Sequence, residues 1–137
     1  MTKQELRSYQ HIKTEIAQIE GNIRELNSRM YSPRTPHLTG LPGAASTERG
    51  SAQERAATEL FALRDHYEQK IRELLQRQLK IEKAIDAIED PVMRMLLRYR
   101  YIDGRSWNQI AILMNYSVDH IWRKHGQALM ILKDDSL

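Results

Sequence analysis

Residues 106–133 read SWNQIAILMNYSVDHIWRKHGQALMILK. The segment opens with Ser106, followed three positions later by a glutamine, and this capping box predicts a helix over residues 106–114. Asn115–Ser117 then form a tight turn, in which the serine can cap a second helix over residues 117–133. Two short helices joined by about three residues predict a helix-turn-helix.

The second of these helices has two distinct faces. One face repeats at intervals of three and four residues and is expected to pack in the core: Val118, Ile121, His125, Ala128 and Leu132. His125 is therefore expected to be packed and hydrogen-bonded rather than a metal ligand. The opposite face carries Asp119, Trp122, Arg123 and Gly126. Its N-terminal half is the part that would enter a major groove of DNA.

Candidate contacts to DNA fall into two groups. The candidates for contacts to base edges lie on or beside the exposed face: Asp119, His120, Trp122 and Arg123. Arg123 is the strongest of them, because arginine pairs bidentately with guanine in the major groove. Trp122 would pack either on a thymine methyl group or on a neighbouring helix. The candidates for contacts to phosphates, which set register rather than sequence preference, are Arg105, Ser106, Trp107, Lys124 and Gln127.

The stretch Leu97–Ala111, LRYRYIDGRSWNQIA, resembles the start of region four of sigma-70-type sigma factors. The resemblance continues through later positions: Asn115–Val118, Ile121 and Ala128–Leu129. The chain is more closely similar to phage and prophage late-gene regulators of the ArpU and RinA kind. Arg123 and His125–Gly126 resemble that group, as do a coiled-coil front and a Pro/Gly-rich middle. The resemblance implies binding to promoter DNA and leaves open a contact with RNA polymerase.

The charge of the chain is unevenly distributed. Residues 1–90 carry 14 basic and 14 acidic side chains, whereas residues 91–137 carry 7 and 4, which gives the entire net charge of +3. A neutral front and a basic back indicate an anionic partner for the back. Nothing in residues 1–90 resembles region two, the part of a sigma factor that melts the promoter. An accessory transcription regulator is therefore expected, rather than a free-standing sigma factor.

Residues 1–30 are predicted to form a coiled-coil helix. Its apolar side chains alternate at spacings of three and four, so the stripe stays against a partner helix along its length. The stripe consists of Tyr9, Ile12, Ile16, Ile19, Ile23, Leu26 and Met30. Residues 31–50 hold three of the four prolines and three of the six glycines, and this composition predicts a linker.

A second coiled-coil helix is predicted over residues 51–90, beginning at a capping box in Ser51–Glu54. Its stripe consists of Leu60, Leu63, Tyr67, Ile71, Leu74, Gln78, Ile81, Ile85 and Ile88. The two stripes would pair within one chain as an antiparallel hairpin, or between chains to form a dimer. The sequence leaves both arrangements open.

Residues 91–133 are predicted to form the helix-turn-helix DNA-binding module. Asp90 as the N-cap and Pro91 at the first helical position begin its first helix, over residues 91–102. Tyr99 and Tyr101 are expected at the core and rim of that helix, respectively. The predicted fold class is therefore all-α, with a long coiled-coil helical hairpin followed by a three-helix module like sigma region four.

The composition argues against several other classes of protein. There are no cysteines, which excludes disulfide scaffolds and thiolate chemistry. No apolar run reaches the roughly 18 residues that a membrane helix needs, and the first residues do not form a secretory signal. A cytoplasmic protein is expected. There is also no Gly-rich phosphate loop, metal-spaced His–Glu pair or nucleophile elbow, so neither an enzyme nor a metal or cofactor is expected.

The expected function is sequence-specific binding of double-stranded DNA by a transcription regulator of phage or prophage origin. A homodimer is favoured, and it would place two recognition helices about 34 Å apart on successive major grooves. One alternative is a small terminase subunit, which would recognise phage DNA for packaging as a ring of many subunits. The other is an adaptor whose basic module binds an acidic protein surface and no DNA.

Overall fold

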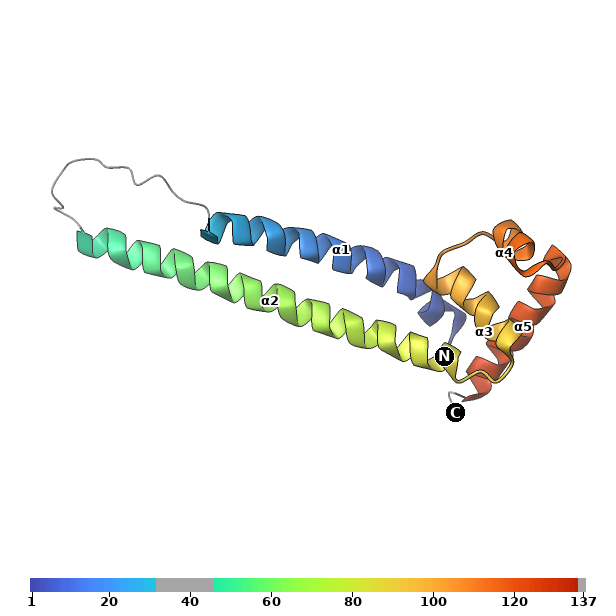
Figure 1. Ribbon diagram of the computed structural model, residues 1–137. Coiled ribbons are helices and arrows are strands. Elements are labelled where there is room, and N and C mark those ends of the chain that lie inside the picture. The colour runs from blue at the N-terminus through green and yellow to red at the C-terminus, as the bar shows by residue number, and fades with distance from the viewer. Residues whose placement is uncertain (32–45, 136–137) are drawn as a thin grey trace. The chain divides into compact units, whose positions relative to one another are not determined.

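The computed structural model describes residues 1–31 and 46–135 of the chain. Every regular element in these residues is helical (Figure 1), which confirms the predicted all-α fold class. The elements are α1 (Lys3–Tyr31), α2 (Ser46–Asp86), α3 (Pro91–Leu97), the π-helical segment η1 (Arg98–Ile102), α4 (Trp107–Met114) and α5 (Val118–Asp135). Across the described residues, no helix has both the length and the apolar character needed to cross a membrane.

The chain divides into two compact units. The first unit comprises Met1–Glu15 and Leu74–Leu137, and the second comprises Ile16–Glu73. Both units contain a piece of α1 and a piece of α2, and the first unit also contains every later helix. The helix-turn-helix therefore shares its unit with the beginning of α1, a partner that the sequence did not assign to it.

The second unit is built from two helices of the same chain. Ile16, Ile19 and Leu26 of α1 are buried in it. A small hollow lined from both helices, by Leu26 of α1 and by Leu63 and Tyr67 of α2 among others, shows that they lie side by side. The stripe of α1 thus packs within the chain here, which is one of the two arrangements that the sequence left open.

The stripe of α2 is less completely covered in the second unit than in the first. Leu63 is 40% exposed, whereas Leu74, Ile81 and Ile85 in the first unit are at most 4% exposed. Phe61, which lies off the predicted stripe, is 54% exposed. The buried part of the α2 stripe therefore lies mainly in the first unit.

The predicted start of the second helix was wrong. The helix α2 begins at Ser46, so Ser51 lies inside it rather than at a capping box. Residues 46–50 include one glycine, which costs about 1 kcal/mol in a helix, but extending a formed helix adds a backbone hydrogen bond per residue. The predicted linker accordingly loses these five positions to α2, and residues 32–45 lie outside the described residues. The helix also ends earlier than predicted, at Asp86.

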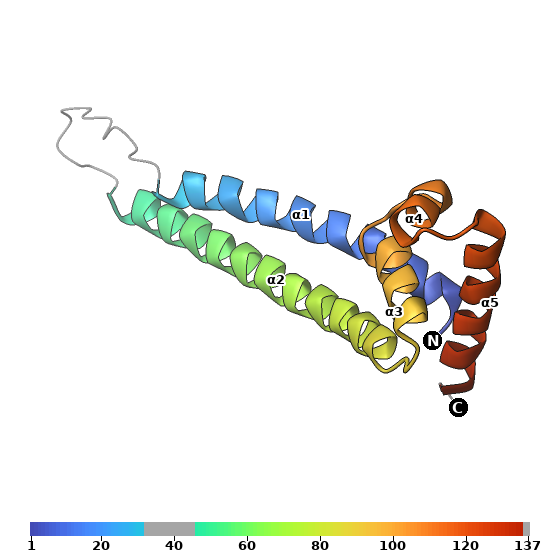
Figure 2. The same ribbon diagram turned by 45° about the vertical axis from the view of Figure 1, so that its right-hand side comes forward.

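The core of the first unit draws on every helix that the unit contains. Its fully buried side chains include Leu6 of α1, Ile85 of α2, Leu96 of α3, Ile110 of α4 and Ile121 of α5. Both α3 and α4 pack against α5 (Figure 2). Burying a side chain of this size contributes about 1.5–3 kcal/mol, so these few residues supply much of the unit's stability.

The first helix of the module starts as the sequence predicts. Asp90 accepts a hydrogen bond from the Val92 amide at 2.8 Å, and Pro91 occupies the first turn. These contacts hold the pKa of Asp90 below its usual range, chiefly through the bond from Val92 and with a smaller effect of Lys124. The carboxylate thus both caps α3 and faces a cation of α5.

The predicted helix over residues 91–102 is not uniformly α-helical. It changes to a π-helical turn at η1, where the Asp103 amide donates to the Arg98 carbonyl, five residues earlier, at 2.9 Å. Tyr101 and Ile102 in this turn are buried, as are Leu96 and Leu97 at the end of α3. The prediction for the two tyrosines was therefore wrong: Tyr101 lies in the core and Tyr99 is only half-buried, because the π-helical turn changes which residues of this segment face inward.

Hydrogen bonds to one partly buried carboxylate, that of Glu82, connect α1, α2 and η1 inside the first unit. The Tyr9 hydroxyl donates to Glu82 Oε1 at 2.9 Å, and the Arg98 guanidinium donates to Glu82 Oε2 at 2.8 Å. Burial and the neighbouring Glu82 carboxylate raise the pKa of Tyr9 to about 12. One carboxylate thus satisfies donors from two other helices, which fixes the register of α1 against the module.

Candidate nucleic-acid interface

The helix-turn-helix is formed by α4, a short turn and α5. Ser106 and Gln109 form the predicted capping box, with the Ser106 hydroxyl accepting from the Gln109 amide at 3.2 Å and the Gln109 side chain accepting from the Ser106 amide at 3.1 Å. Asn115 ends α4 in the left-handed conformation, with φ 59°. The Ser117 hydroxyl then accepts from the His120 amide at 3.2 Å and caps α5.

The two helices cross on small and branched apolar side chains. Ile110 of α4 and Ile121 of α5 are completely buried, and Ala111 is 8% exposed. The Tyr116 amide donates to the Ala111 carbonyl at 3.1 Å, which closes the turn beside the crossing. Since Ala111 has only a methyl group, α5 can approach α4 closely, as the sequence predicts.

The predicted outer face of α5 is exposed. Asp119, Trp122, Arg123 and Gly126 all lie at the surface, and the Trp122 indole is 53% exposed. The guanidinium of Arg123 has no hydrogen-bond or ion-pair partner among residues 1–31 and 46–135. An exposed tryptophan beside an uncommitted arginine is unusual on a surface facing only water, and both groups are available to a partner.

Gly126 has no packing reason to be glycine. A β-carbon added at this position would meet no other atom within 4 Å, and the residue lies in the middle of α5. A glycine inside a helix costs up to about 1 kcal/mol relative to alanine. The residue therefore weakens α5 at its exposed face, where it lets another molecule approach the backbone closely.

We expect the Gly126→Ala variant to be more stable than the wild type by about 0.4–1 kcal/mol, because alanine lowers the backbone entropy of the unfolded chain. Urea denaturation followed by circular dichroism measures this free energy of unfolding. Gly21→Ala, in the middle of α1 and with its nearest neighbour at an ordinary 3.7 Å, is the matched control and should give a similar gain. A loss of stability in Gly126→Ala alone would show that its surroundings are not open.

Two further residues predicted to contact DNA are engaged in intramolecular contacts. His120 is half-buried, and its ring lies 4.7 Å from that of Tyr116, the residue after the αL turn. The Lys124 ammonium lies 3.5 Å from the Asp90 carboxylate, and both side chains are about one-third exposed. Their predicted contacts to DNA stay predictions, and for Lys124 such a contact would compete with an existing ion pair.

Three of the remaining phosphate candidates lie at the N-terminus of α4, and the fourth, Gln127, lies on α5. Arg105 is exposed with its guanidinium carbon 5.8 Å from the centre of the Tyr99 ring, and Ser106 uses its hydroxyl as the cap of α4. Trp107 is half-buried beneath the Arg100 guanidinium, whose central carbon lies 4.4 Å from the ring centre. Gln127 is exposed on α5. Arg105 and Gln127 are therefore the most accessible members of this group.

His125 is the buried histidine that the sequence predicts. It is 7% exposed, its Nε2 atom lies 2.6 Å from the Tyr101 hydroxyl, and its ring meets the Trp107 ring edge-on at 4.7 Å. Burial lowers the pKa of His125 to about 4, and the positive charges of Lys3, Arg100 and Arg7 add to this effect. The imidazole is therefore neutral at pH 7.

The three cations that act on His125 were not among the predicted site residues. Lys3 and Arg7 lie at the start of α1, and Arg100 lies in η1, yet they line one pocket of the first unit. Only Arg100 gave a sequence signal, as part of the basic and aromatic run before α4. No group of three potential metal-ligating side chains occurs in the described part of the chain.

Two helices that cross on a small residue and are joined by a capped three-residue turn define a helix-turn-helix protein. The chain belongs to the family described as Protein of unknown function (DUF1492), whose profile matches residues 46–133, more than half of its length. The match runs from the start of α2 into the last turns of α5 and so contains the whole helix-turn-helix. Comparison with curated proteins and with solved structures gives no match.

Proposed function

We propose that this protein is a sequence-specific DNA-binding transcription regulator that reads promoter DNA with α5. The observation that carries the proposal is the outer face of α5, where Trp122 is half exposed and Arg123 is uncommitted among the described residues. The N-terminal part of a second helix in this motif is the part that reaches base edges. The protein would act by binding rather than by catalysis, in the cytoplasm of a bacterium that carries a phage or prophage.

The side chains of this face match the chemistry of the major groove. Arginine can donate two hydrogen bonds to O6 and N7 of one guanine, and a flat apolar ring can cover a thymine methyl group. Asp119 can accept a hydrogen bond from the amino group of cytosine. Gly126, one turn further along α5, lets the helix backbone lie close to the wall of the groove.

A protein partner is also proposed, because apolar side chains are exposed beside the turn. Ile112 is 80% exposed, Leu113 is 49% exposed and Tyr116 is 41% exposed. Adjacent exposed apolar groups of this size are typical of surfaces that bind another protein. The partner would be RNA polymerase, as in the regulators that the chain resembles, or a second copy of the chain in a homodimer on two half-sites.

The experiment that tests the proposed function is a selection of bound sequences from a random duplex library at about 150 mM salt. An enriched motif is expected, with Arg123 as its main base contact, and the spacing of any half-sites will report the number of protomers. The logarithm of affinity should fall linearly with the logarithm of salt concentration, since phosphate contacts release counterions.

The same experiment separates the proposal from its rivals. Binding without an enriched motif, by a ring of many subunits in mass measurements, would favour a small terminase subunit. The absence of both enrichment and a salt-dependent affinity for DNA would favour the adaptor that binds an acidic protein surface. Either result would refute a sequence-specific regulator.

A further inference from the structure

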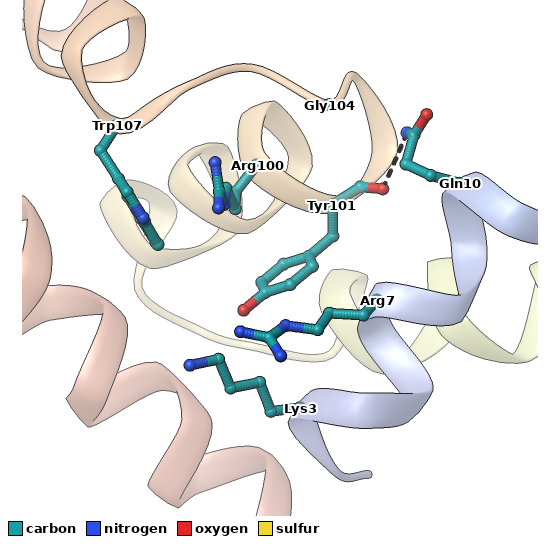
Figure 3. Close-up of a pocket in the computed structure, with 7 residues that line it drawn as sticks. All are labelled: Lys3, Arg7, Gln10, Arg100, Tyr101, Gly104 and Trp107. Atoms are coloured by element: carbon teal, nitrogen blue, oxygen red, sulfur yellow. Dashed lines mark hydrogen bonds between the residues drawn. The ribbon is translucent and has the colours of Figure 1, made fainter.

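The first unit contains an open pocket of about 280 Å³ between the start of α1, η1 and the start of α4 (Figure 3). It is lined by Lys3, Arg7, Gln10, Arg100, Tyr101, Gly104 and Trp107. The pocket is separate from the outer face of α5, because none of the residues predicted to contact base edges lines it. Tyr101 connects its floor to buried His125 through the 2.6 Å hydrogen bond.

The pocket concentrates positive charge. Lys3, Arg7 and Arg100 contribute three cations, and no carboxylate lies among the described residues that line it. In Figure 3 the ammonium group of Lys3 and the guanidinium of Arg7 both extend toward the hydroxyl of Tyr101. None of the three cations forms an ion pair within residues 1–31 and 46–135.

Two other cations of the same unit are paired with carboxylates. Arg98 lies 2.8 Å from Glu82 and 3.6 Å from Asp86, and Lys124 lies 3.5 Å from Asp90. Three uncompensated cations around one hollow repel each other, and a bound anion would relieve that repulsion. The positive potential is felt below the pocket, where it contributes to the lowered pKa of His125.

The walls of the pocket are held in place by contacts of their own. Arg100 lies over the Trp107 ring at 4.4 Å and donates to the Arg105 carbonyl at 3.0 Å. The side-chain amide of Gln10 donates to the backbone carbonyls of Tyr101 and Ile102, which fixes α1 against the end of η1. Groups that are already positioned lose little entropy when a ligand arrives.

Gly104 completes this wall for a steric reason. It has φ +72°, and a β-carbon at this position would lie 3.3 Å from the Gln10 side chain. The loop between η1 and α4 therefore needs glycine both for its conformation and for the close approach of α1. The pocket is thus assembled by a specific contact between segments that are about 90 residues apart.

We propose that this pocket binds a phosphate group, held by the guanidinium groups of Arg7 and Arg100 and the ammonium group of Lys3. Guanidinium forks match the spacing of phosphate oxygens, and a phosphate monoester carries about −1.5 to −2 charges near neutral pH, which suits three cations. The phosphate would be a monoester on a small metabolite, which carries that charge, or a diester of a DNA backbone, which carries a single negative charge. The site goes beyond the proposed reading of bases by α5 and does not depend on it.

The test is a titration of the full chain with inorganic phosphate at constant ionic strength, followed by the NMR signals of Gly104 and the Trp107 indole. Saturable shifts are expected in the wild type. Arg7→Gln and Lys3→Gln should each weaken the apparent affinity by about tenfold, the loss of one charge-assisted contact. Lys13→Gln, which removes an exposed charge on α1 outside the pocket, is the matched control and should leave the affinity unchanged.

A second readout follows the imidazole beneath the pocket. Bound phosphate should raise the pKa of His125 in the wild type and in Lys13→Gln, and Arg7→Gln should need about tenfold more phosphate for the same shift. Shifts that never saturate, or that are the same in all four proteins, would overturn the site. Arg7→Gln and Lys3→Gln change exposed side chains and should therefore fold like the wild type. Circular dichroism before the titration checks this.

Titration with a short duplex distinguishes the two sources of phosphate. If Arg7→Gln weakens binding of every duplex alike and lowers the salt slope by about 1, the phosphate belongs to the DNA backbone. If Arg7→Gln loses inorganic phosphate but keeps its affinity for DNA, the ligand is a small phosphorylated molecule. A wild type that binds no DNA would refute the proposed function, whereas the phosphate titration would still decide the pocket.

Discussion

Replacing Arg123 by alanine is expected to cost about 1–3 kcal/mol on the preferred duplex, or roughly 5- to 150-fold in Kd. The physical reason is the loss of two hydrogen bonds to one guanine, which leaves the acceptor atoms of that base unpaired in the groove. The loss should be smaller on random DNA, so the preference at one base position should relax. Fluorescence anisotropy with the selected motif and with single-base variants of it measures both effects.

The fold should not change in this variant. Arg123 is exposed and uncommitted among the described residues, and substitutions at such positions usually alter stability by less than about 0.5 kcal/mol. A loss of binding would therefore reflect a lost contact rather than unfolding. Thermal melting of Arg123→Ala beside the wild type checks this point.

Arg105→Ala is the better comparison for a contact to phosphate. Lys124→Ala should also weaken all sequences alike, but Lys124 already pairs with Asp90 at the N-cap of α3, so its removal disturbs the module as well. Arg105 is exposed, and its replacement by alanine should lower the affinity for preferred and random DNA by the same factor. Equal losses on both kinds of DNA for Arg123→Ala would refute its role in reading a base.

Much of the module could be predicted because its determinants are local. The caps at Asp90 and Ser106 are side chains that bond to amides two or three residues away, and both form as predicted. The spacing of Ile121 and His125 on α5 fixes which side of that helix faces the core, and both are buried. Periodicity and capping depend on near neighbours, so they can be recognised without the tertiary structure.

The start of α2 and the change of helix type at η1 could not be predicted in this way. Whether a helix continues past a possible cap depends on small differences in free energy between neighbouring starts, and Ser46 rather than Ser51 begins α2. The π-helical turn depends on what the core can accept, since it is the burial of Tyr101 and Ile102 together that favours it. Neither the free-energy difference between helix starts nor the packing that favours the π-helical turn can be deduced from residue spacing.

The phosphate pocket was missed for a different reason. Lys3 and Arg7 are ordinary basic residues on the polar side of a coiled-coil stripe, where they predict only a solvated face. They gain a role because Gln10 binds the end of η1, a contact between positions about 90 residues apart. The spacing of residues in a single sequence gives no direct sign of such a distant contact.

The stability of the protein is expected to fall as the pH is lowered from about 6.5 to about 4, through His125. In the unfolded chain this histidine takes up a proton near pH 6.5, whereas in the folded protein its pKa is about 4. Between these values the unfolded state binds more protons, so the free energy of unfolding rises with pH. The full contribution of His125 to this free energy is present above about pH 6.5. The contribution is of the order of 3 kcal/mol.

Urea denaturation at a series of pH values from 4 to 7.5 measures this dependence. In His125→Gln, the part of the slope that the histidine supplies should disappear, although the variant will be less stable at every pH because its contacts with Tyr101 and Trp107 change. His11→Gln, at an exposed position of α1, is the matched control and should keep the wild-type slope. If His125→Gln also kept that slope, the histidine would not be the group responsible.

The physical origin of this dependence lies in the surroundings of the ring. Protonated His125 would lose most of its hydration in the core and would be a fourth positive charge close to Lys3, Arg7 and Arg100. Acid should therefore loosen the contact of α5 with η1 and the start of α1 before it affects the exposed face of α5. An NMR titration of the imidazole with a midpoint near pH 4 is the expected result, and a midpoint near 6.5 would contradict the charge-enclosed site that the pocket and the stability prediction share.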